Sequence, residues 1–259
     1  MLVRGGGAGQ PRLIMTAIYE TNRLLAEYLL FHYGSPEEIL PAAVAVPDGM
    51  RSALDFPCRT VARFTPGMVA RGLDLGCAVG RSSFEMARTC GEVVGIDFSH
   101  SFIAAAQALQ GGESIGYERL DEGNRHTSLT ASAPEGIDAS RVRFRQGDAM
   151  RLADDPGFFD RVHAANLLCR LRDPAMLLKR LPGLVNAGGE LVLATPCTWL
   201  DEFTPRENWP PGCTLEWLLE CLAPDFSLLD VTEEPFLIRE TERKFQWTTS
   251  QTSLWRRKG

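Results

Sequence analysis

A turn between a strand and a helix, at residues 73–83, limits the possible folds of this chain more than any other feature. The segment reads Leu-Asp-Leu-Gly-Cys-Ala-Val-Gly-Arg-Ser-Ser. An apolar run over 69–75 precedes the turn and a helical pattern over 83–88 follows it, so Gly76 and Gly80 fall where a buried strand becomes a helix. Glycine at such a place permits positive φ and lets a ligand approach the backbone closely.

An acidic residue ends the next apolar run. Residues 93–96 are followed directly by Asp97. A carboxylate about 20 residues after a glycine-rich turn can accept hydrogen bonds from the hydroxyls of a ribose. Because adjacent parallel strands end at the same edge of a sheet, the turn and Asp97 together predict a nucleoside pocket there. The alternative is a turn that binds nothing, and the match at Asp97 argues against it.

The spacing of the turn indicates which nucleoside it suits. A dinucleotide site needs G-x-G-x-x-G to seat a pyrophosphate, but here Ala78 replaces the middle glycine, and no G-x-x-x-x-G-K-[ST] loop occurs. Asp74 would repel a phosphate and suit a cation. The spacing from Asp74 through Gly76 to Gly80 resembles the first motif of class I S-adenosylmethionine-dependent methyltransferases. That cofactor carries ribose, adenine, ammonium and sulfonium groups but no phosphate.

Composition and charge favour one enzyme-sized globular domain. The 259 residues can bury a large core, and 44% hydrophobic and 23% charged residues are typical of globular proteins. The net charge of −6 gives no support for a nucleic-acid substrate. No apolar run reaches the ~18 residues of a membrane span, and the first residues lack the apolar region of a secretion signal. We therefore expect a cytoplasmic protein that binds neither nucleic acid nor membrane.

The cysteines and histidines show no spacing typical of a metal site. Seven cysteines form no C-x-x-C pair, and four histidines form neither H-x-x-x-H nor H-E-x-x-H. We expect reduced thiols and no metal site. Cys77 is interpreted as a small packing residue in the turn, and His163, shortly before a strand end, as a buried structural histidine.

Alternating strand and helix patterns predict an α/β fold with a Rossmann-like, doubly wound sheet of seven strands. The last predicted strand has no helix before it, so we expect it to be antiparallel. Residues 1–12 are predicted to be disordered and 13–259 to form one domain, with an N-terminal helical cap over 13–68 and the Rossmann-like core over 69–259. Strands are expected at 70–75, 92–97, 142–146, 159–166, 190–195, 227–232 and 246–256. Helices are expected at 13–33, after Ser35, and at 80–88, 100–109, 175–185 and 213–222.

Residues 111–140 form a polar insertion without a clear period. A lid or binding loop and a solvated surface excursion are both compatible with this pattern.

The methyltransferase resemblance extends to the later strand tips. It implies that Asp148 accepts a hydrogen bond from the adenine amino group while the backbone of Ala149 contacts a ring nitrogen. Arg59 is a further candidate for the cofactor carboxylate. The implied cofactor-binding residues are Asp74, Gly76, Gly80, Arg81, Asp97, Phe98, Asp148, Ala149 and Asn166.

Several segments in order resemble a narrower family, the 5-thiohistidine (4-mercaptohistidine) N-methyltransferases of ovothiol biosynthesis. Of the six segments that resemble this family, the last two, 199–207 and 243–247, carry the narrower resemblance. In that family the domain is often the C-terminal part of a larger enzyme whose other part forms the carbon–sulfur bond. We expect this chain to be the free-standing form, functionally linked to a sulfoxide synthase that acts earlier. The segments are 19–22, 73–83, 95–99, 165–171, 199–207 and 243–247.

The resemblance implies methylation of the imidazole Nπ (N1) of 5-thiohistidine, which gives ovothiol A. Tyr19, Asn22 and Asn166 are expected to position the ring, and Tyr19 and Asn22, three residues apart, would share a helix face. The implied substrate-binding residues are Tyr19, Asn22, Trp199, Phe203, Thr204, Arg243 and Lys244. Two alternatives stay open: another small acceptor such as histidine or a thiol, and a non-catalytic cofactor-fold module that supports a partner enzyme. The intact set of Asp74, Gly76, Gly80 and Asp97 argues against the module.

Overall fold

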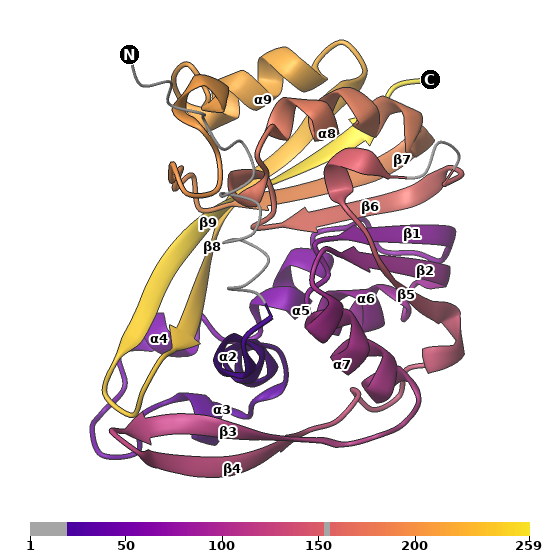
Figure 1. The fold of residues 1–259 in the computed structure, drawn as a ribbon. Helices are drawn as coiled ribbons and strands as arrows, with labels where there is room; N and C mark the ends of the chain where they lie inside the picture. The colour runs from indigo at the N-terminus through magenta and orange to yellow at the C-terminus, as the bar shows by residue number, and fades with distance from the viewer. Residues whose placement is uncertain (1–19, 153–155) are drawn as a thin grey trace, which may run out of the picture.

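A seven-stranded sheet forms the centre of the molecule (Figure 1). The structure is a computed structural model that describes residues 20–152 and 156–259, so the predicted disorder of 1–12 and the position of Tyr19 lie outside the described residues. The strand order is β5-β2-β1-β6-β7-β9-β8, and β9 is antiparallel to both of its neighbours. This confirms the predicted sheet and its antiparallel last strand. The strands are β1 (Val69–Leu75), β2 (Cys90–Asp97), β5 (Val142–Gln146), β6 (Phe159–Ala165), β7 (Val185–Thr195), β8 (Phe226–Arg239) and β9 (Phe245–Arg257).

Helices cover both faces of the sheet, as the doubly wound prediction requires. Successive strand residues point to opposite faces, so Leu191 and Leu193 pack in one core with α8 and α9 while Val192 packs in the other with α2, α6 and α7. The helices are α2 (Asn22–Tyr33), α3 (Pro36–Ile39), α4 (Asp48–Arg51), α5 (Phe56–Val61), α6 (Arg81–Met86), α7 (His100–Gln110), α8 (Pro174–Arg180) and α9 (Thr214–Leu222). Short 3₁₀ turns are η1 (Ala139–Arg141), η2 (Ala149–Arg151), η3 (Leu168–Arg170), η4 (Leu181–Gly183) and η5 (Arg206–Asn208).

The N-terminal helix is shorter than predicted. Thr21 has extended backbone angles, and its side chain accepts a hydrogen bond from the Leu24 amide, so α2 begins at Asn22. The prediction of one continuous helix over 13–33 is therefore wrong at residues 20 and 21. Consequently Asn22 is the first residue of α2, and the expected shared face with Tyr19 depends on a residue outside the described ones. The predicted helix after Ser35 is confirmed as α3, and it opens with a capping box in which the Ser35 amide donates to Glu38 Oε2 at 2.7 Å.

The insertion at 111–140 contains a hairpin that the sequence pattern did not predict. Strands β3 (Ile115–Glu122) and β4 (Arg125–Ala131) pair antiparallel in a separate two-stranded sheet, joined at Gly123 with φ +56°. On β3 the inward positions hold Tyr117, Arg119 and Asp121. The carboxylate of Asp121 accepts from Arg119 at 2.9 Å and from Thr127 at 2.5 Å. A buried polar network thus replaces the apolar alternation by which strands are recognised.

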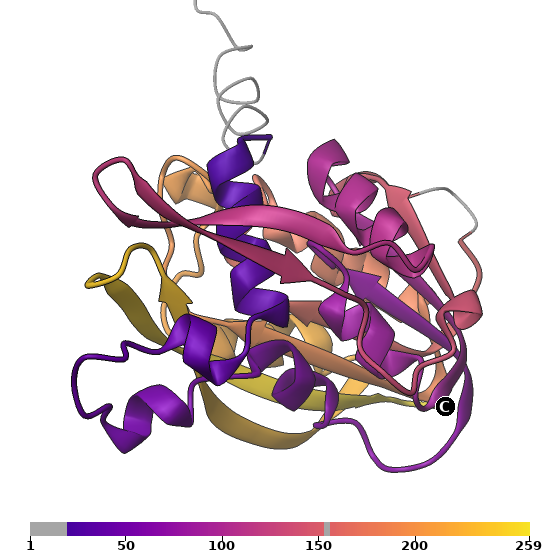
Figure 2. The ribbon, with the colours of Figure 1, turned by 90° about the horizontal axis from the view of Figure 1, so that it is seen from below.

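Strands β8 and β9 are also longer than predicted and extend past the sheet as a hairpin arm. Figure 2 shows α2 lying between this arm and the β3–β4 hairpin. The Glu242 amide donates to the Asp121 carbonyl at 3.0 Å, which joins the two hairpins. Arg239 of the arm donates to the carbonyl of Glu38 at 2.9 Å. The arm is therefore bonded to the β3–β4 hairpin and to α3, the helix that follows α2. Among the helices of the described residues, none has both the length and the hydropathy of a membrane span.

Candidate active site

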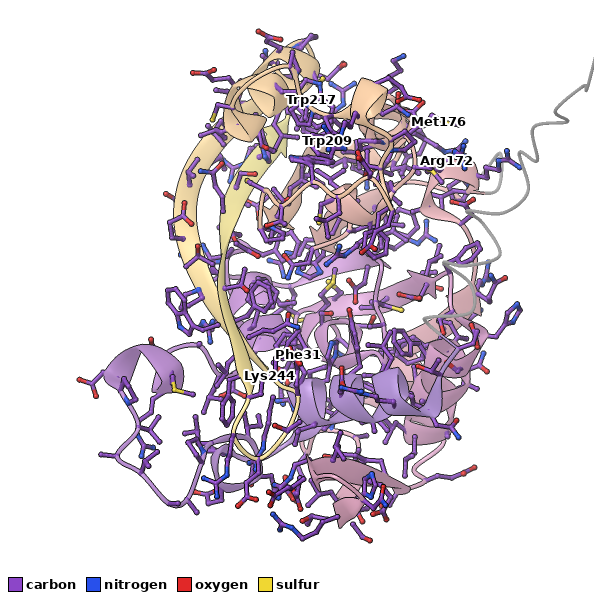
Figure 3. All side chains as sticks on the ribbon, turned by 60° about the vertical axis from the view of Figure 1, so that its left-hand side comes forward. Phe31, Arg172, Met176, Trp209, Trp217 and Lys244 are labelled. Carbon is purple, nitrogen blue, oxygen red and sulfur yellow. The ribbon has the colours of Figure 1, made fainter. Side chains whose placement is uncertain are left out.

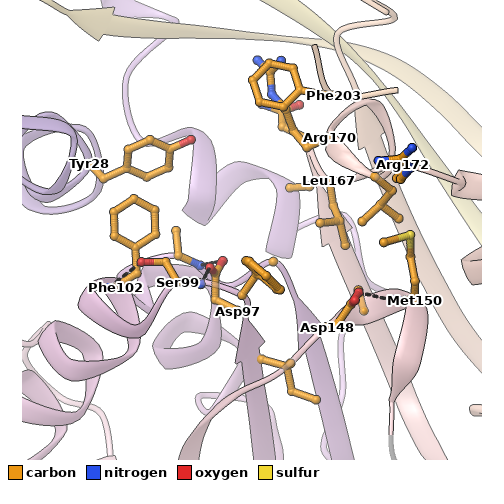
Figure 4. A pocket seen from close by; sticks show the side chains of 18 of the residues that line it. Tyr28, Asp97, Ser99, Phe102, Asp148, Met150, Leu167, Arg170, Arg172 and Phe203 are labelled. Atoms are coloured by element: carbon orange, nitrogen blue, oxygen red, sulfur yellow. Dashed lines mark hydrogen bonds between the residues drawn. The ribbon is translucent and has the colours of Figure 1, made fainter. Parts of the chain in front are cut away.

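A cavity of about 580 Å³ lies at the edge of the sheet where β1, β2, β5 and β6 end (Figure 4). Its volume is within the range of pockets for small ligands. Strand tips supply Gly76, Asp97, Asp148 and Asn166. The helix α2, the arm strand β8 and the loop after β7 supply the remaining walls. The predicted site edge is therefore the edge that carries the cavity.

The two glycines of the turn have different surroundings. Both have positive φ, +71° at Gly76 and +93° at Gly80. Gly76 lines the cavity. A Cβ on Gly80 would lie 2.6 Å from the Phe144 ring, inside the protein. The structure therefore does not bring Gly80 to the cavity, and the Phe144 ring is a reason for glycine at this position that involves no ligand.

Asp97 is fixed at the tip of β2 by two backbone groups. Its Oδ2 accepts from the Ala78 amide and its Oδ1 from the Ser99 amide, both at 2.9 Å. Burial raises the pKa of this carboxyl to about 6. Since an ionised carboxylate has about four acceptor sites, each oxygen keeps one for a further donor. This arrangement suits the two hydroxyls of a ribose.

The tip of β5 supplies the neighbouring part of the wall. Asp148 Oδ1 accepts from the Met150 amide at 2.9 Å, and the Gly147 amide donates to the Asp97 carbonyl at 2.9 Å. The two strand tips are thus joined, and Ile96 also lines the cavity. The structure brings together, as lining residues, the predicted cofactor residues Gly76, Asp97, Phe98, Asp148, Ala149 and Asn166.

Asp74 is predicted to face a cationic ligand, but its carboxylate is buried away from the cavity. Its Oδ2 accepts from Ser83 Oγ at 2.6 Å, and its Oδ1 lies 2.8 Å from His163 Nδ1. His163 Nε2 in turn lies 3.0 Å from Thr60 Oγ1. Asp74 therefore connects β1 to α6, β6 and α5. His163 is buried and structural, as expected, although it also lines the cavity.

Two arginines predicted as cofactor ligands are held elsewhere. Arg81 Nε pairs with Glu85 at 3.1 Å, and its guanidinium lies over the Tyr33 ring. Arg59 Nε pairs with Glu234 of the arm at 3.0 Å. Neither lines the cavity. Both side chains connect surface elements to each other.

Asn166 occupies the tip of β6 in a strained conformation. Its φ is +54°, which is uncommon for a residue other than glycine and occurs often at functional sites. Its Oδ1 accepts from Ser250 Oγ at 2.6 Å. No hydrogen bond joins its Nδ2 to a described residue, so this donor is available to a ligand in the cavity.

Among the predicted substrate residues, Phe203 lines the cavity and Asn22 does not. Asn22 borders a separate hollow of about 460 Å³ between α2 and the β3–β4 hairpin. Trp199 Nε1 donates to Thr214 Oγ1 at 3.1 Å, and the indole packs edge-on against Trp217. Thr204 is buried. Trp199 and Thr204 therefore pack the loop after β7, and they do not face the cavity.

Arg243 and Lys244 lie at the tip of the hairpin arm. Figure 3 shows Lys244 in the lower part of the molecule, far from Trp209 and Trp217 at the top. Lys244 Nζ pairs with Glu240 at 2.5 Å, and the Arg243 amide donates to Thr241 Oγ1 at 3.3 Å. Neither lines the cavity. The structure therefore does not bring either residue to the cavity, and their contacts with a substrate stay a prediction.

Sequence reasoning missed the aromatic wall opposite the strand tips. Phe31 of α2 stacks on Phe56 of α5 with ring centroids 6.2 Å apart, and Phe56 lies 5.1 Å from Phe236 of β8. Burial lowers the pKa of His32, beside them, to about 3, so its ring is neutral. The only sequence signal for this wall is the aromatic cluster around Tyr28 on α2, a pattern that is also typical of a helix face packed in the core. Within residues 20–152 and 156–259, no group of three or more metal-ligating side chains is arranged to hold a metal ion.

Comparison with protein families gives a match to the methyltransferase domain family over residues 73–193. A curated relative, the O-methyltransferase resE of Aspergillus sclerotiorum, is 28% identical over 135 residues, which are 52% of this chain and 42% of the relative. A ubiquinone biosynthesis O-methyltransferase of Azorhizobium caulinodans is 30% identical over 125 residues, 48% of this chain and 40% of the relative. The matches thus span about two fifths of the length of these curated relatives.

Solved structures share the fold over most of the chain. Magnesium protoporphyrin IX methyltransferase (ChlM) from Synechocystis PCC 6803 with bound SAM has a TM-score of 0.55 at 16% identity, covering 98% of this chain and 100% of that one. The N-methyltransferase NodS from Bradyrhizobium japonicum WM9, in complex with S-adenosyl-L-homocysteine, has a TM-score of 0.53 at 15% identity, covering 90% and 98%.

The [4+2]-cyclase SpnF has the same fold with a TM-score of 0.55 at 19% identity, covering 89% of this chain and 78% of that one. The fold alone therefore does not fix the reaction. The family match and the strand-tip side of the cavity give further information about the reaction. Residues 73–193 match the methyltransferase domain family, and the strand-tip residues Gly76, Asp97, Asp148 and Asn166 of the cavity all lie within this matched segment.

Proposed function

We propose that this chain transfers a methyl group from S-adenosylmethionine to the imidazole Nπ of 5-thiohistidine, which gives ovothiol A. One observation carries the proposal: a single cavity runs from the carboxylate of Asp97 to the aromatic wall of Phe31, Phe56 and Phe236. A small flat acceptor fits beside the cofactor in such a space. The sequence resemblance of the segments around α2 and of residues 199–207 supports 5-thiohistidine as that acceptor.

The residues present fit the cofactor. Asp97 accepts from ribose hydroxyls and Asp148 from an adenine amino group. Among the described residues that line the cavity there is no lysine, and Arg81 pairs with Glu85 outside it. When bound, S-adenosylmethionine supplies a methyl group whose bond to sulfur breaks as the electron pair stays on sulfur, so a positively charged sulfonium becomes a neutral thioether.

The protein has little proton transfer to perform. With its sulfur as thiolate and a proton on Nτ, the acceptor presents a free electron pair on Nπ, and the new N–CH₃ bond leaves a ring cation balanced by its own thiolate. No base is needed. The chain must instead exclude water and aim the nitrogen, since a thiolate is normally the better nucleophile. Asn166 Nδ2 and the rings of Phe31 and Phe203 are placed to hold the acceptor ring.

An acceptor panel tests the proposal. Purified protein and S-adenosylmethionine are incubated with 5-thiohistidine, histidine or ergothioneine, and products are analysed by mass spectrometry. We expect methylated 5-thiohistidine and one equivalent of S-adenosylhomocysteine, with much slower turnover of histidine, because the pocket partners of the sulfur would be left unpaired. Asp97→Ala is the negative control. Equal rates on histidine and 5-thiohistidine contradict the proposed acceptor.

A second candidate is methylation of a hydroxyl group on an aromatic acceptor. The observation in its favour is that the curated relatives are O-methyltransferases. The same panel with a catechol distinguishes the two, since turnover of the catechol alone would support the second candidate. Cofactor binding without turnover of any acceptor would support a non-catalytic module.

A further inference from the structure

Arg170 stands out among the arginines that line the cavity because its side chain is half-buried, whereas those of Arg151 and Arg172 are exposed. It ends the short η3 turn that follows the tip of β6 and lines the cavity. The side chain is half-buried, and its Nη1 is buried without a hydrogen-bond partner. No hydrogen bond or ion pair joins this guanidinium to any described residue. A buried donor without a partner is costly, so such a group is suited to a ligand that supplies acceptors.

The surrounding residues orient the Arg170 guanidinium but do not accept hydrogen bonds from it. Its central carbon lies 4.3 Å from the centroid of the Phe203 ring, a cation–π contact that orients the planar group. The nearby loop carboxylate of Asp201 pairs with Arg206 at 2.7 Å. Arg161, which also has a buried nitrogen without a partner, differs because its terminal nitrogens donate to Thr89 at 2.5 Å and to Gly67 at 3.1 Å.

The position of Arg170 assigns it to the acceptor side of the cavity. In Figure 4, Arg170 and Phe203 lie at the top of the pocket, across the open space from Asp97 and Asp148 below. The nucleoside end of the cofactor belongs with the two aspartates. A carboxylate that meets Arg170 comes either from the methyl acceptor or from the amino-acid end of the cofactor, and the affinity for S-adenosylhomocysteine separates the two.

We propose that Arg170 is the specificity-determining residue that binds a carboxylate of the acceptor, and this rests on the proposed function. A guanidinium presents parallel N–H groups that match a carboxylate in bidentate geometry. An amino-acid acceptor would be anchored by its carboxylate at Arg170, and its ring would then reach past Phe203 toward Asn166. Acceptors of the same ring without the carboxylate would bind weakly.

Two substrates and two variants test this. Wild type, Arg170→Gln and Arg170→Lys are assayed with 5-thiohistidine and with its decarboxylated amine, 5-thiohistamine. The matched control is Arg145→Gln, which removes the same charge from the exposed face of β5, where the guanidinium makes no hydrogen bond or ion pair with described residues. Affinity for S-adenosylhomocysteine and the melting temperature are measured for each protein.

We expect Arg170→Gln to lower kcat/KM for 5-thiohistidine roughly 10- to 100-fold, the loss of hydrogen bonds to a charged group. Its effect on 5-thiohistamine should be small, Arg170→Lys should recover part of the loss, and Arg145→Gln should match wild type. Equal losses on both substrates, or a matching loss of S-adenosylhomocysteine affinity, would overturn the assignment.

A second experiment separates the carboxylate site at Arg170 from the proposal that 5-thiohistidine is the acceptor. If wild type does not turn over 5-thiohistidine, the S-adenosylhomocysteine complex is titrated calorimetrically with L-histidine and with histamine. Binding of L-histidine that is lost in Arg170→Gln supports the carboxylate site without any turnover. Equal binding of L-histidine and histamine, or no difference between wild type and variant, contradicts it.

Discussion

At the scale of single residues, Asp97 has the largest consequence for the cofactor. Two backbone amides orient its carboxylate, so its free acceptor positions are fixed before a ligand arrives. We predict that Asp97→Ala weakens S-adenosylhomocysteine binding by about 1.5–3 kcal/mol, the range for hydrogen bonds to a charged group. Isothermal titration calorimetry measures this, with the exposed, distant Asp138→Ala as control. Unchanged affinity in Asp97→Ala would mean that the ribose binds elsewhere.

The raised pKa of Asp97 gives a pH dependence to the same interaction. The carboxyl has a pKa of about 6 in the free protein, and donors from a ribose favour its ionised form. Binding therefore lowers this pKa, so affinity is full above about pH 7 and falls as the pH drops through 6, by at most about tenfold per unit. The α-amino and α-carboxyl groups of S-adenosylhomocysteine titrate outside this range.

Calorimetric titrations between about pH 5 and pH 8 test this prediction, with Asp97→Asn as the matched variant that cannot ionise. The variant should show weak binding with no such pH dependence. A wild-type affinity that stays constant down to about pH 5, or the same pH dependence in Asp97→Asn, would show that another group titrates.

At the scale of elements, the β1–α6 turn depends on glycine for packing. A Cβ at Gly80 would meet the Phe144 ring at 2.6 Å, whereas a Cβ at Gly112, also at positive φ, would meet no atom within 4 Å. We predict that Gly112→Ala costs about 1–2 kcal/mol for the left-handed backbone alone. Gly80→Ala adds overpacking and should cost about 2–4 kcal/mol in total.

Urea denaturation measures both losses, and the double variant Gly80→Ala with Phe144→Leu should recover part of the difference. If Gly80→Ala is no less stable than Gly112→Ala, the contact with Phe144 does not explain the glycine. A loss of cofactor affinity in a fully folded Gly80→Ala protein would instead support the contact between Gly80 and the cofactor that the sequence pattern predicts.

At the scale of the whole molecule, the parallel part of the fold was predictable and the arms were not. Strands such as β1 and β2 are buried on both faces, so they read as continuous apolar runs that end at motif residues. The β3–β4 hairpin buries Asp121 and Arg119 as ion-paired partners, and the arm part of β8 carries Glu233, Glu234 and Pro235. Their pairing depends on tertiary contacts that a local pattern does not contain.

The residues of the candidate site also fall into a predictable and an unpredictable group. Asp97, Asp148 and Asn166 follow from strand ends and spacing, because the sheet edge brings them together. Arg170 and Phe236 reach the cavity only through the folding of η3 and the arm. The orientation of Asp74 was not predictable, because spacing locates a residue along a strand but does not show that its carboxylate is bonded to Ser83 and His163.

The position of the transferred methyl group tests the central claim most directly. S-adenosylmethionine labelled with ¹³C in the methyl group is turned over with 5-thiohistidine, and the product is examined by NMR. We expect long-range correlations from the methyl protons to the ring carbon that bears the side chain and to the carbon between the nitrogens, which identifies a methyl on Nπ. A methyl that correlates only with the sulfur-bearing carbon, or a label that stays in S-adenosylmethionine while the cofactor binds, would contradict the account.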